Sequence, residues 1–363
     1  MRIAFYGSSL LSAYWNGAAT YYRGILRALS EKGYEITFYE PDVYDRQKNR
    51  DIEPPEWCQV VVYEGTIEAL KKVAGEARRA DIVVKASGVG FEDDLLLDEV
   101  LRAARPGALK IFWDVDAPAT LAELRAAPDH PLRLALQAID IVLTYGGGEP
   151  VVNAYREMGA HDCVPIYNAL DPHTHHPVSA QARFEGDLGF LGNRLPDREA
   201  RVEAFFLEPA ARTPSQRFLL GGSGWGDKPM SSNITYLGHV GTADHNAFNV
   251  SPKAVLNISR SSMAEIGFSP ATRVFEAAGA GACLITDYWE GISLFLQPDA
   301  EILVARDGQD VAAIMADLTP ERASRIGKAA LERVLREHTY AHRAIDADRV
   351  FKSSARRQIE AAE

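Results

Sequence analysis

The sequence predicts an α/β protein made of two halves, each a mostly parallel β-sheet with helices between its strands. First, short apolar runs typical of strands covered on both faces alternate with amphipathic stretches along most of the chain. Second, a polar stretch at 168–177, which contains Pro172 and Pro177, interrupts this alternation once before it resumes. Third, loops rich in glycine and serine follow several predicted strands, where open α/β sheets bind their ligands.

Composition and charge narrow the class of protein. The chain has 363 residues, 47% of them hydrophobic and 25% charged, which suits a globular protein with two domains. Its formal net charge of −11 argues against nucleic acid as a main partner, although one basic pocket for a small phosphate is compatible with it. The three isolated cysteines indicate a reducing compartment, and we find neither a signal peptide nor a membrane-spanning run. We therefore expect a cytoplasmic protein.

The first half opens with the β-α-β unit of a doubly wound sheet. A strand at 2–6, a loop rich in glycine and serine, an amphipathic helix and a strand at 34–39 follow one another. Asn16 is the predicted N-cap of this helix. Because Gly7 and Gly17 are about ten positions apart, the loop lacks the GxGxxG spacing of dinucleotide-binding proteins, which argues against a dehydrogenase.

Two carboxylates follow a later strand of the first half. The remaining strands of this half are predicted at 81–85, 109–113, 140–144 and 164–167. Asp114 and Asp116 come directly after the strand at 109–113, where active-site residues of open sheets gather. The alternative interpretation is that both carboxylates stabilise a turn and the start of a helix before Pro118.

The polar stretch at 168–177 is predicted to connect the two halves. Its three histidines, His173, His175 and His176, suggest a metal site at first sight. Their spacing, however, is not that of two ligands one helical turn apart, and no acidic or cysteine cluster accompanies them. We expect a solvated linker and no metal.

The second half repeats the strand–loop–helix pattern. Its strands are predicted at 188–191, 217–220, 234–237, 255–258, 283–286 and 301–304. The loop at 192–198 opens a helix and carries Arg194 and Arg198. The loop at 221–226 is too rich in glycine for a regular element, so the backbone at Gly222 is a candidate for ligand contact.

The stretch 265–288 gives the firmest indication of a ligand. Gly267 and Pro270 keep the chain out of a helix until about Ala271, and the helix start then offers unpaired N–H groups that suit a phosphate. Arg273 adds a positive charge in the first turn, and Glu276 can accept hydrogen bonds from hydroxyls one turn later. Phosphate donors beside such a carboxylate indicate a nucleotide. The alternative is an ordinary β-α-β crossover with a solvated Arg/Glu pair.

Several segments together resemble the GT-B glycosyltransferases of the "group 1" kind, and most of all their CgeB-type, spore-protein-like branch. The matching segments lie at 140–160, 164–178, 189–194, 267–292, 301–307 and 337–344. The resemblance covers essentially the whole chain. It implies two Rossmann-like domains that face each other across a cleft: an acceptor domain at 1–172 and a nucleotide-sugar donor domain at 173–337. A helix at 338–363 would return to the first domain.

The resemblance implies a cytoplasmic, hexosyltransferase-like enzyme that moves a sugar from a nucleotide-diphosphate sugar to an unidentified acceptor, with no cofactor. Glu276 matches the carboxylate that binds the ribose hydroxyls. Other positions match contacts to the diphosphate or the base, namely Gly17, Arg194, Arg198, His239, Val240, Ser269, Thr272 and Arg273. We expect a metal-independent site, because Asp114-Val-Asp116, which has the letters of a DxD triplet, follows a strand of the first half and suits the acceptor side better.

One departure from the family concerns the mechanism. Retaining members carry Glu-x7-Glu, but the position eight before Glu276 is Phe268, and the nearest acid is Glu265. An inverting reaction needs a general base, for which Asp116 and then Asp114 are the candidates, with His130 behind them. Two other classes remain open: a non-catalytic nucleotide-sugar-binding protein of the same fold, and a GT-B sugar-nucleotide epimerase or another nucleotide-dependent α/β enzyme.

Overall fold

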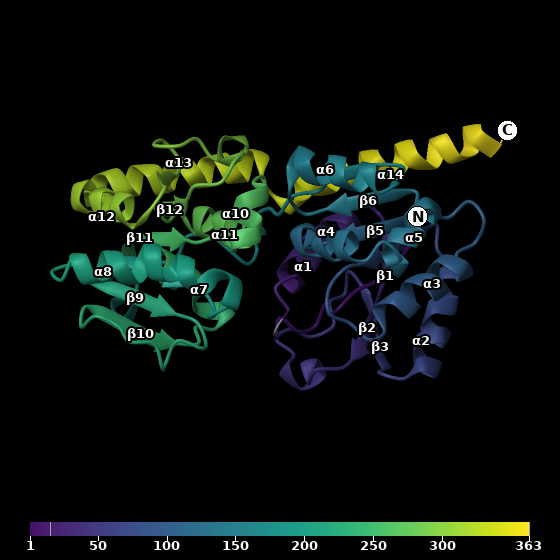
Figure 1. Cartoon of the computed structure of the whole chain (residues 1–363), viewed down its shortest axis with the longest axis horizontal. Coiled ribbons are helices and arrows are strands. Elements are labelled where there is room, and N and C mark those ends of the chain that lie inside the picture. Colours follow the sequence, from purple (N-terminus) through teal and green to yellow (C-terminus); the bar gives the residue numbers. More distant parts are fainter. Residues whose placement is uncertain (15, 363) are drawn as a thin grey trace. The chain divides into compact units, whose positions relative to one another are not determined.

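The computed structural model describes residues 1–14 and 16–362, with side chains described up to 354. Contacts between residues divide the chain into two compact units (Figure 1). Unit 1 comprises Met1–Tyr167 and Tyr340–Glu363, and unit 2 comprises Asn168–Thr339. The sequence places the corresponding boundaries after 172 and after 337.

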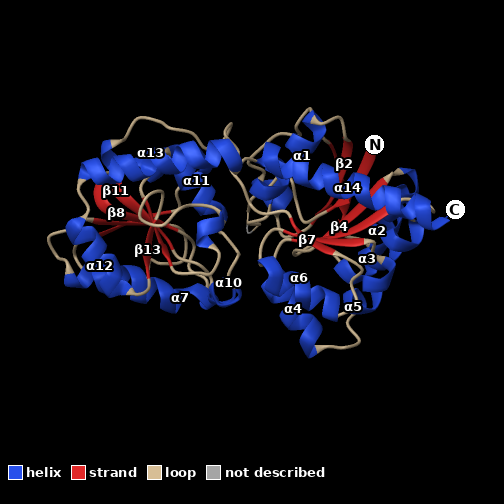
Figure 2. Ribbon diagram, turned by 90° about the horizontal axis from the view of Figure 1, so that it is seen from above, coloured by secondary structure: helices blue, strands red, loops and turns tan. Residues whose placement is uncertain are grey.

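Unit 1 is built on a seven-stranded parallel sheet in the order β3-β2-β1-β4-β5-β6-β7. Its strands are β1 (Arg2–Tyr6), β2 (Glu35–Asp42), β3 (Gln59–Glu64), β4 (Ile82–Ala86), β5 (Leu109–Asp114), β6 (Ile141–Thr144) and β7 (Cys163–Pro165). Its helices are α1 (Ala19–Glu31), α2 (Ile67–Ala74), α3 (Asp93–Ala103), α4 (Ala117–Ala126), α5 (Pro131–Ala135), α6 (Gly148–Glu157) and α14 (Tyr340–Ala362). Helices α1 and α14 lie together on one face of the sheet (Figure 2).

The C-terminal helix α14 is an integral part of unit 1. Gly24 in α1 leaves the space that the ring of Tyr340 fills, since a Cβ at Gly24 would lie 2.1 Å from Cδ2 of Tyr340. The hydroxyl of Tyr34 donates to Oδ1 of Asp348 at 2.8 Å. Phe351 completes the contact by packing against the buried ring of Tyr34.

Unit 2 is built on a six-stranded parallel sheet in the order β10-β9-β8-β11-β12-β13. Its strands are β8 (Gly186–Leu191), β9 (Phe218–Gly221), β10 (Ile234–Gly238), β11 (Pro252–Asn257), β12 (Leu284–Asp287) and β13 (Leu303–Ala305). Its helices are α7 (Pro196–Val202), α8 (Glu208–Arg212), α9 (His245–Val250), α10 (Ser261–Ile266), α11 (Thr272–Ala280), α12 (Gly308–Asp317) and α13 (Pro320–Glu337). Helices α11 and α13 cover one face, and α7, α10 and α12 the other (Figure 2).

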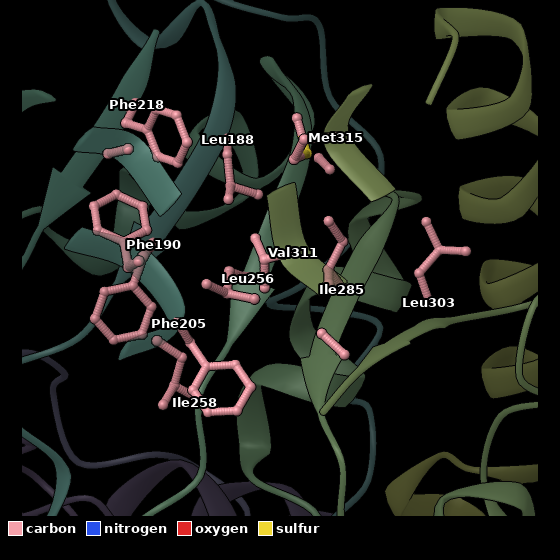
Figure 3. Packing of buried hydrophobic residues seen from close by; sticks show 14 of the residues in the cluster. Leu188, Phe190, Phe205, Phe218, Leu256, Ile258, Ile285, Leu303, Val311 and Met315 are labelled. Atoms are coloured by element: carbon pink, nitrogen blue, oxygen red, sulfur yellow. The ribbon is translucent and has the colours of Figure 1, made fainter. Parts of the chain in front are cut away.

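The strand order locates the ligand edge of unit 2. The first strand, β8, lies beside the fourth, β11, with Gly189 opposite Val255. The order of the strands therefore reverses between them, and open α/β sheets bind ligands beyond the carboxyl ends of the strands at such a switch point. Beneath this edge lies a buried apolar core that includes Leu188, Phe190, Leu256 and Ile285 (Figure 3).

The α/β class and the two doubly wound parallel sheets are confirmed. Three local predictions need correction. Asn16 is not the N-cap of α1, since Ala18 occupies that position and the buried Asn16 amide donates to the carbonyls of Ser9 and Ser12 instead. Strand β3 escaped prediction because its run VVVY is short, at an edge position, and only partly buried. The linker is not uniformly solvated, because His175 is 3% exposed.

Among the described residues, no helix combines the length and the apolar character that crossing a membrane requires.

Candidate functional site

The N-terminus of α11 forms the floor of the candidate site in unit 2. Ala271 occupies the N-cap with an extended backbone, and its side chain makes no capping hydrogen bond. The first N–H groups of the helix therefore point outward without a capping side chain, which favours an anion at this end. Predicted positions Ser269, Thr272 and Arg273 all lie at or just before this helix start.

Two left-handed residues and one backbone hydrogen bond determine the conformation of the loop before α11. Gly267 and Phe268 have φ angles of 71° and 48°, both in the left-handed region, and Phe268 N donates to Glu290 O at 2.6 Å. A Cβ at Gly267 would lie 2.8 Å from Cβ of Glu290, so the close approach needs glycine. The loop buries Ser269, whose Oγ has no hydrogen-bond partner in the described part of the chain.

Positive charge gathers at this end of α11. Arg198 comes from the first turn of α7, and its guanidinium lies over the ring of Phe190, 5.7 Å from the centroid. Burial, followed by the charges of Arg273 and Arg260, lowers the pKa of Arg198 to about 10. Burial also lowers the pKa of Arg273. Among the described residues, neither Arg198 nor Arg273 forms an ion pair with a carboxylate, although the charge of Glu276 acts on Arg273 and those of Asp197 and Asp287 act on Arg198.

Arg194 has a different environment. Its guanidinium pairs with Glu199 at 2.7 Å and with Asp227 at 2.9 Å. These two carboxylates raise the pKa of Arg194 above its ordinary value. Its charge is therefore already compensated, and it would have to leave both partners to bind a phosphate.

Asp287 is a buried strand-end carboxylate that the sequence analysis missed. It ends β12, is fully buried, and accepts hydrogen bonds from the backbone N–H and the hydroxyl of Ser259 and from Arg201 at 2.6 Å. Burial raises the pKa of Asp287 despite these donors. Asp287 thereby fixes the loop after β11 that carries Arg260. The position of Asp287 at the end of a predicted strand was the available sequence signal, but only the tertiary contacts reveal which residues bond to its carboxylate.

Glu276 lies one turn into α11 beside two histidines. The ligand atoms of His175, His245 and Glu276 all lie within 4.8 Å of one another. Burial on its own would raise the pKa of Glu276, but the neighbouring charges of His175, Arg273 and His245 outweigh it and the pKa is lowered. The carboxylate is therefore ionised at neutral pH, as an acceptor for two vicinal hydroxyls must be.

The remaining predicted residues of unit 2 lie on loops at the same sheet edge. His239 is exposed, whereas Val240 is buried and its carbonyl oxygen lies 3.3 Å from Nε2 of His245. Gly222 has a φ of 118°, and a Cβ there would lie 2.2 Å from the carbonyl oxygen of Gly192. This close approach explains the glycine, and its N–H donates to Gly238 O.

In unit 1, the two predicted aspartates have different surroundings. Asp114 is fully buried and accepts hydrogen bonds from the hydroxyls of Ser87, Thr120 and Tyr155 at 2.5–3.0 Å. Burial raises the pKa of Asp114. Asp116 instead lines a cavity of about 520 Å³ at the carboxyl ends of β4 and β5, together with His130. Of the two, Asp116 is the carboxylate that a small molecule in this cavity can reach.

Gly17 and a second cavity complete the description of unit 1. Gly17 is exposed on the loop before α1, and a Cβ there would meet no described residue within 4 Å, so no close approach among those residues requires glycine. A cavity of about 730 Å³ opens at the other edge of the sheet, where β1, β2 and β3 begin. Because ligands of open α/β sheets bind at the carboxyl ends, the smaller cavity beside Asp116 is the better candidate.

Comparisons with known proteins agree with this architecture. A family model described as glycosyl transferase-like matches residues 198–348. A search of curated proteins finds no match. Sucrose-phosphate synthase from Thermosynechococcus elongatus superposes with a TM-score of 0.70 at 15% identity, over 100% of both chains. HepE from Anabaena, in complex with UDP and glucose, gives a TM-score of 0.68 at 13% identity over 97% of this chain and 100% of HepE.

A third solved structure is similar over almost its full length. An α-glucosyltransferase in complex with UDP and DNA gives a TM-score of 0.71 at 11% identity, over 97% of this chain and 99% of that one. At these identities the likeness shows the fold. The chain therefore has the GT-B glycosyltransferase fold, and both HepE and the α-glucosyltransferase have been solved with UDP bound.

Proposed function

We propose that this protein is a glycosyltransferase that transfers a hexosyl group from a nucleoside-diphosphate sugar bound on unit 2. The observation that carries the proposal is the pair of partly buried guanidiniums, Arg198 and Arg273, which form no ion pair with a carboxylate in the described structure. Arg273 lies in the first turn of α11 and its charge acts on Arg198 in the first turn of α7, while the amides at this end of α11 also favour an anion. A diphosphate supplies the missing negative charge.

The donor is proposed to lie along α11 and the neighbouring loops. The diphosphate occupies the helix N-terminus with Ser269 and Thr272, the ribose hydroxyls donate to Glu276, and the base contacts the loop that contains His239 and Val240. UDP is the nucleotide in several proteins of similar structure, and we take it as the first candidate here.

Loss of the nucleoside diphosphate is the step in which negative charge grows, on the oxygen that leaves the sugar. Preorganised cations and N–H groups stabilise such a charge without the reorganisation that water would need. Arg198, Arg273 and the first amides of α11 are proposed to do this without a metal. Arg194 contributes only if it exchanges its carboxylate partners for the phosphate.

The acceptor is proposed to bind in unit 1, in the cavity lined by Asp116 and His130. Asp116 acts as the general base that removes the proton from the acceptor hydroxyl as it attacks the sugar. Asp114 is proposed to hold the start of α4 and the loop at Ser87 in place through its hydrogen bonds. Because the position of the family's first glutamate is Phe268, we favour inversion at the anomeric carbon.

The presence of Phe268 in place of the family's first glutamate also favours one alternative function. The protein would then bind a nucleotide-sugar without catalysing its transfer, on the same fold. We also keep a sugar-nucleotide epimerase of this fold as an alternative. We also propose that the protein is cytoplasmic, which its three unpaired cysteines support. We propose further that it belongs to the CgeB-like branch.

The test is a panel of nucleoside-diphosphate sugars incubated with the purified protein, with slow donor hydrolysis followed by chromatography. Release of UDP from one donor supports a transferase, and loss of that activity in Arg198→Ala assigns it to unit 2. Tight binding without turnover supports the binding protein, and a rearranged sugar supports the epimerase. The matched control is Arg212→Ala, an exposed arginine of the same unit that pairs with Glu208.

A further inference from the structure

His175 is a buried histidine whose conformation the surrounding chain fixes. Its backbone N–H donates to Asp171 O at 2.9 Å, and the amide of Asn246 donates to the carbonyl of the preceding Thr174 at 2.9 Å. The side chain is 3% exposed, and its Nε2 has no hydrogen-bond partner among the described residues. A buried ring nitrogen without a partner carries an energetic penalty, so it calls for an explanation.

Two further potential metal ligands lie beside the ring of His175. The ring of His245, from α9, lies nearly parallel to that of His175 at an interplanar angle of 25° and a centroid distance of 6.4 Å. Glu276 projects from α11, and the donor atoms of all three residues lie within 4.8 Å of one another. In the part of the chain that the structure describes, this is the one group of histidine, cysteine and acidic side chains with that spacing.

We propose that His175, His245 and Glu276 form a binding site for a transition-metal ion of the zinc class. Two imidazoles and one carboxylate are a donor set that zinc accepts, and a solvent molecule can complete four ligands. Donors on one tetrahedral zinc lie about 3.3 Å apart, given Zn–N distances of about 2.0–2.1 Å. The partly exposed side chains of His245 and Glu276 can rotate to close the remaining difference.

The contacts of His245 suit this role. Its Nε2 lies 3.3 Å from the carbonyl oxygen of Val240. A hydrogen bond there places the proton on Nε2 and leaves the lone pair of Nδ1 for a metal. Metal-bound histidines commonly donate their other N–H to a backbone carbonyl in this way.

The donor set also selects among metals. Mg²⁺ and Ca²⁺ prefer oxygen ligands, whereas two of the three donors here are imidazole nitrogens. The site lies one turn into α11 rather than at its N-terminus, so the metal would not contact the leaving diphosphate, but it would compete with the ribose hydroxyls for the carboxylate of Glu276.

The site can be tested with the metal alone, so the outcome does not depend on the glycosyltransferase proposal. Calorimetric titration of Zn²⁺ into the full chain without nucleotide should show one saturable site, and Mg²⁺ should show none. His175→Ala and His245→Ala should each lower the Zn²⁺ affinity by more than about tenfold, since even outer contacts of metal ligands are worth that much. The exposed neighbours give matched controls, and His173→Ala and His176→Ala should bind Zn²⁺ like the parent.

Co²⁺ gives a second measurement that reports on coordination itself. The visible absorption of bound Co²⁺ should indicate four ligands in the parent and should disappear in both variants, while circular dichroism and thermal unfolding show that they are folded. His245→Asn serves if His175→Ala does not fold, because His245 is only partly buried. Absence of saturable Zn²⁺ binding, or unchanged Zn²⁺ affinity and Co²⁺ absorption in the folded variants, would overturn the assignment.

Discussion

Arg273 lies close enough to Arg198 for its charge to lower the pKa of the Arg198 guanidinium. Two like charges in a partly buried place destabilise the protein unless a negative group joins them. Within the described residues neither side chain forms an ion pair with a carboxylate, and the charges of Glu276 near Arg273 and of Asp197 and Asp287 near Arg198 offset the repulsion only from a longer distance. This pair is the physical basis of the donor site proposed for unit 2.

The first prediction concerns Arg198 itself. Arg198→Ala should weaken binding of both UDP and inorganic pyrophosphate by about 1.5–3 kcal/mol, the range for a hydrogen bond to a charged group. The thermal midpoint of the ligand-free variant should stay the same or rise, because the repulsion from Arg273 is removed. Calorimetric titration and thermal unfolding measure these two effects. Unchanged pyrophosphate affinity would remove Arg198 from the phosphate site, and Arg212→Ala is the control.

The second prediction separates the ribose contact from the phosphate contact. Glu276→Ala should weaken UDP binding by about 1–3 kcal/mol, since the ribose hydroxyls lose a charged acceptor. It should leave pyrophosphate affinity unchanged or higher, because a negative charge near the phosphates is gone. Titrating both ligands into the variant tests the assignment, which fails if UDP affinity is unaltered.

The third prediction distinguishes the two aspartates of unit 1. Asp116→Asn should abolish sugar transfer while donor binding and the thermal midpoint stay near those of the parent. Asp114→Ala should instead lower the free energy of unfolding by about 3 kcal/mol or more, because several buried hydroxyl donors lose their common acceptor. Urea unfolding and donor hydrolysis with an added acceptor measure the two outcomes. Full transfer by Asp116→Asn would exclude Asp116 as the base.

The fourth prediction is that the stability of the fold depends on pH through Asp51, which pairs with Arg23 and bonds to the loop that carries Gly17. Burial would raise the pKa of Asp51, but the two bonds from Arg23, both at 2.8 Å, and the bond from Ala13 N lower it overall. A carboxyl group whose pKa is lower in the folded than in the unfolded state stabilises the fold at pH values above its unfolded pKa. This stabilisation is lost as the pH falls through the folded pKa. Asp51→Asn should therefore cost about 1 kcal/mol of unfolding free energy at pH 7 and less at pH 2, measured by urea unfolding. An equal cost at both pH values would contradict this ion pair.

The fifth prediction tests the packing of the C-terminal helix α14 against α1. Gly24→Ala places a methyl group where the ring of Tyr340 lies, so α14 has to shift on α1. Overpacking of this kind typically lowers stability by about 1–3 kcal/mol. The matched control is Gly75→Ala, because a Cβ at Gly75 meets no described residue within 4 Å. Gly33→Ala does not serve, since Gly33 has a φ of 88° that strains any other residue. Equal stability of Gly24→Ala and Gly75→Ala would contradict the packing described here.

The sequence was sufficient for the fold class because its strands are apolar runs of four to eight residues separated by helices and turns. It also placed Ser269, Thr272, Arg273 and Glu276 near one helix start and Arg198 at the start of another helix, since their positions follow from strand ends and helix starts. It could not show that Arg194 is neutralised, because Asp227 lies 33 positions away in the chain. For the same reason the approach of His175 to His245 and Glu276 had no local signal, since three separate segments supply the three side chains.

The central claim is that a nucleoside diphosphate binds unit 2 at the N-terminus of α11. A crystal structure of the protein with UDP tests it most directly. The account predicts the diphosphate within hydrogen-bond distance of the first amides of α11, with Arg198 and Arg273 beside it and the ribose hydroxyls on Glu276. A nucleotide bound elsewhere, such as in the cavity beside Asp116, with α11 left empty, would contradict it.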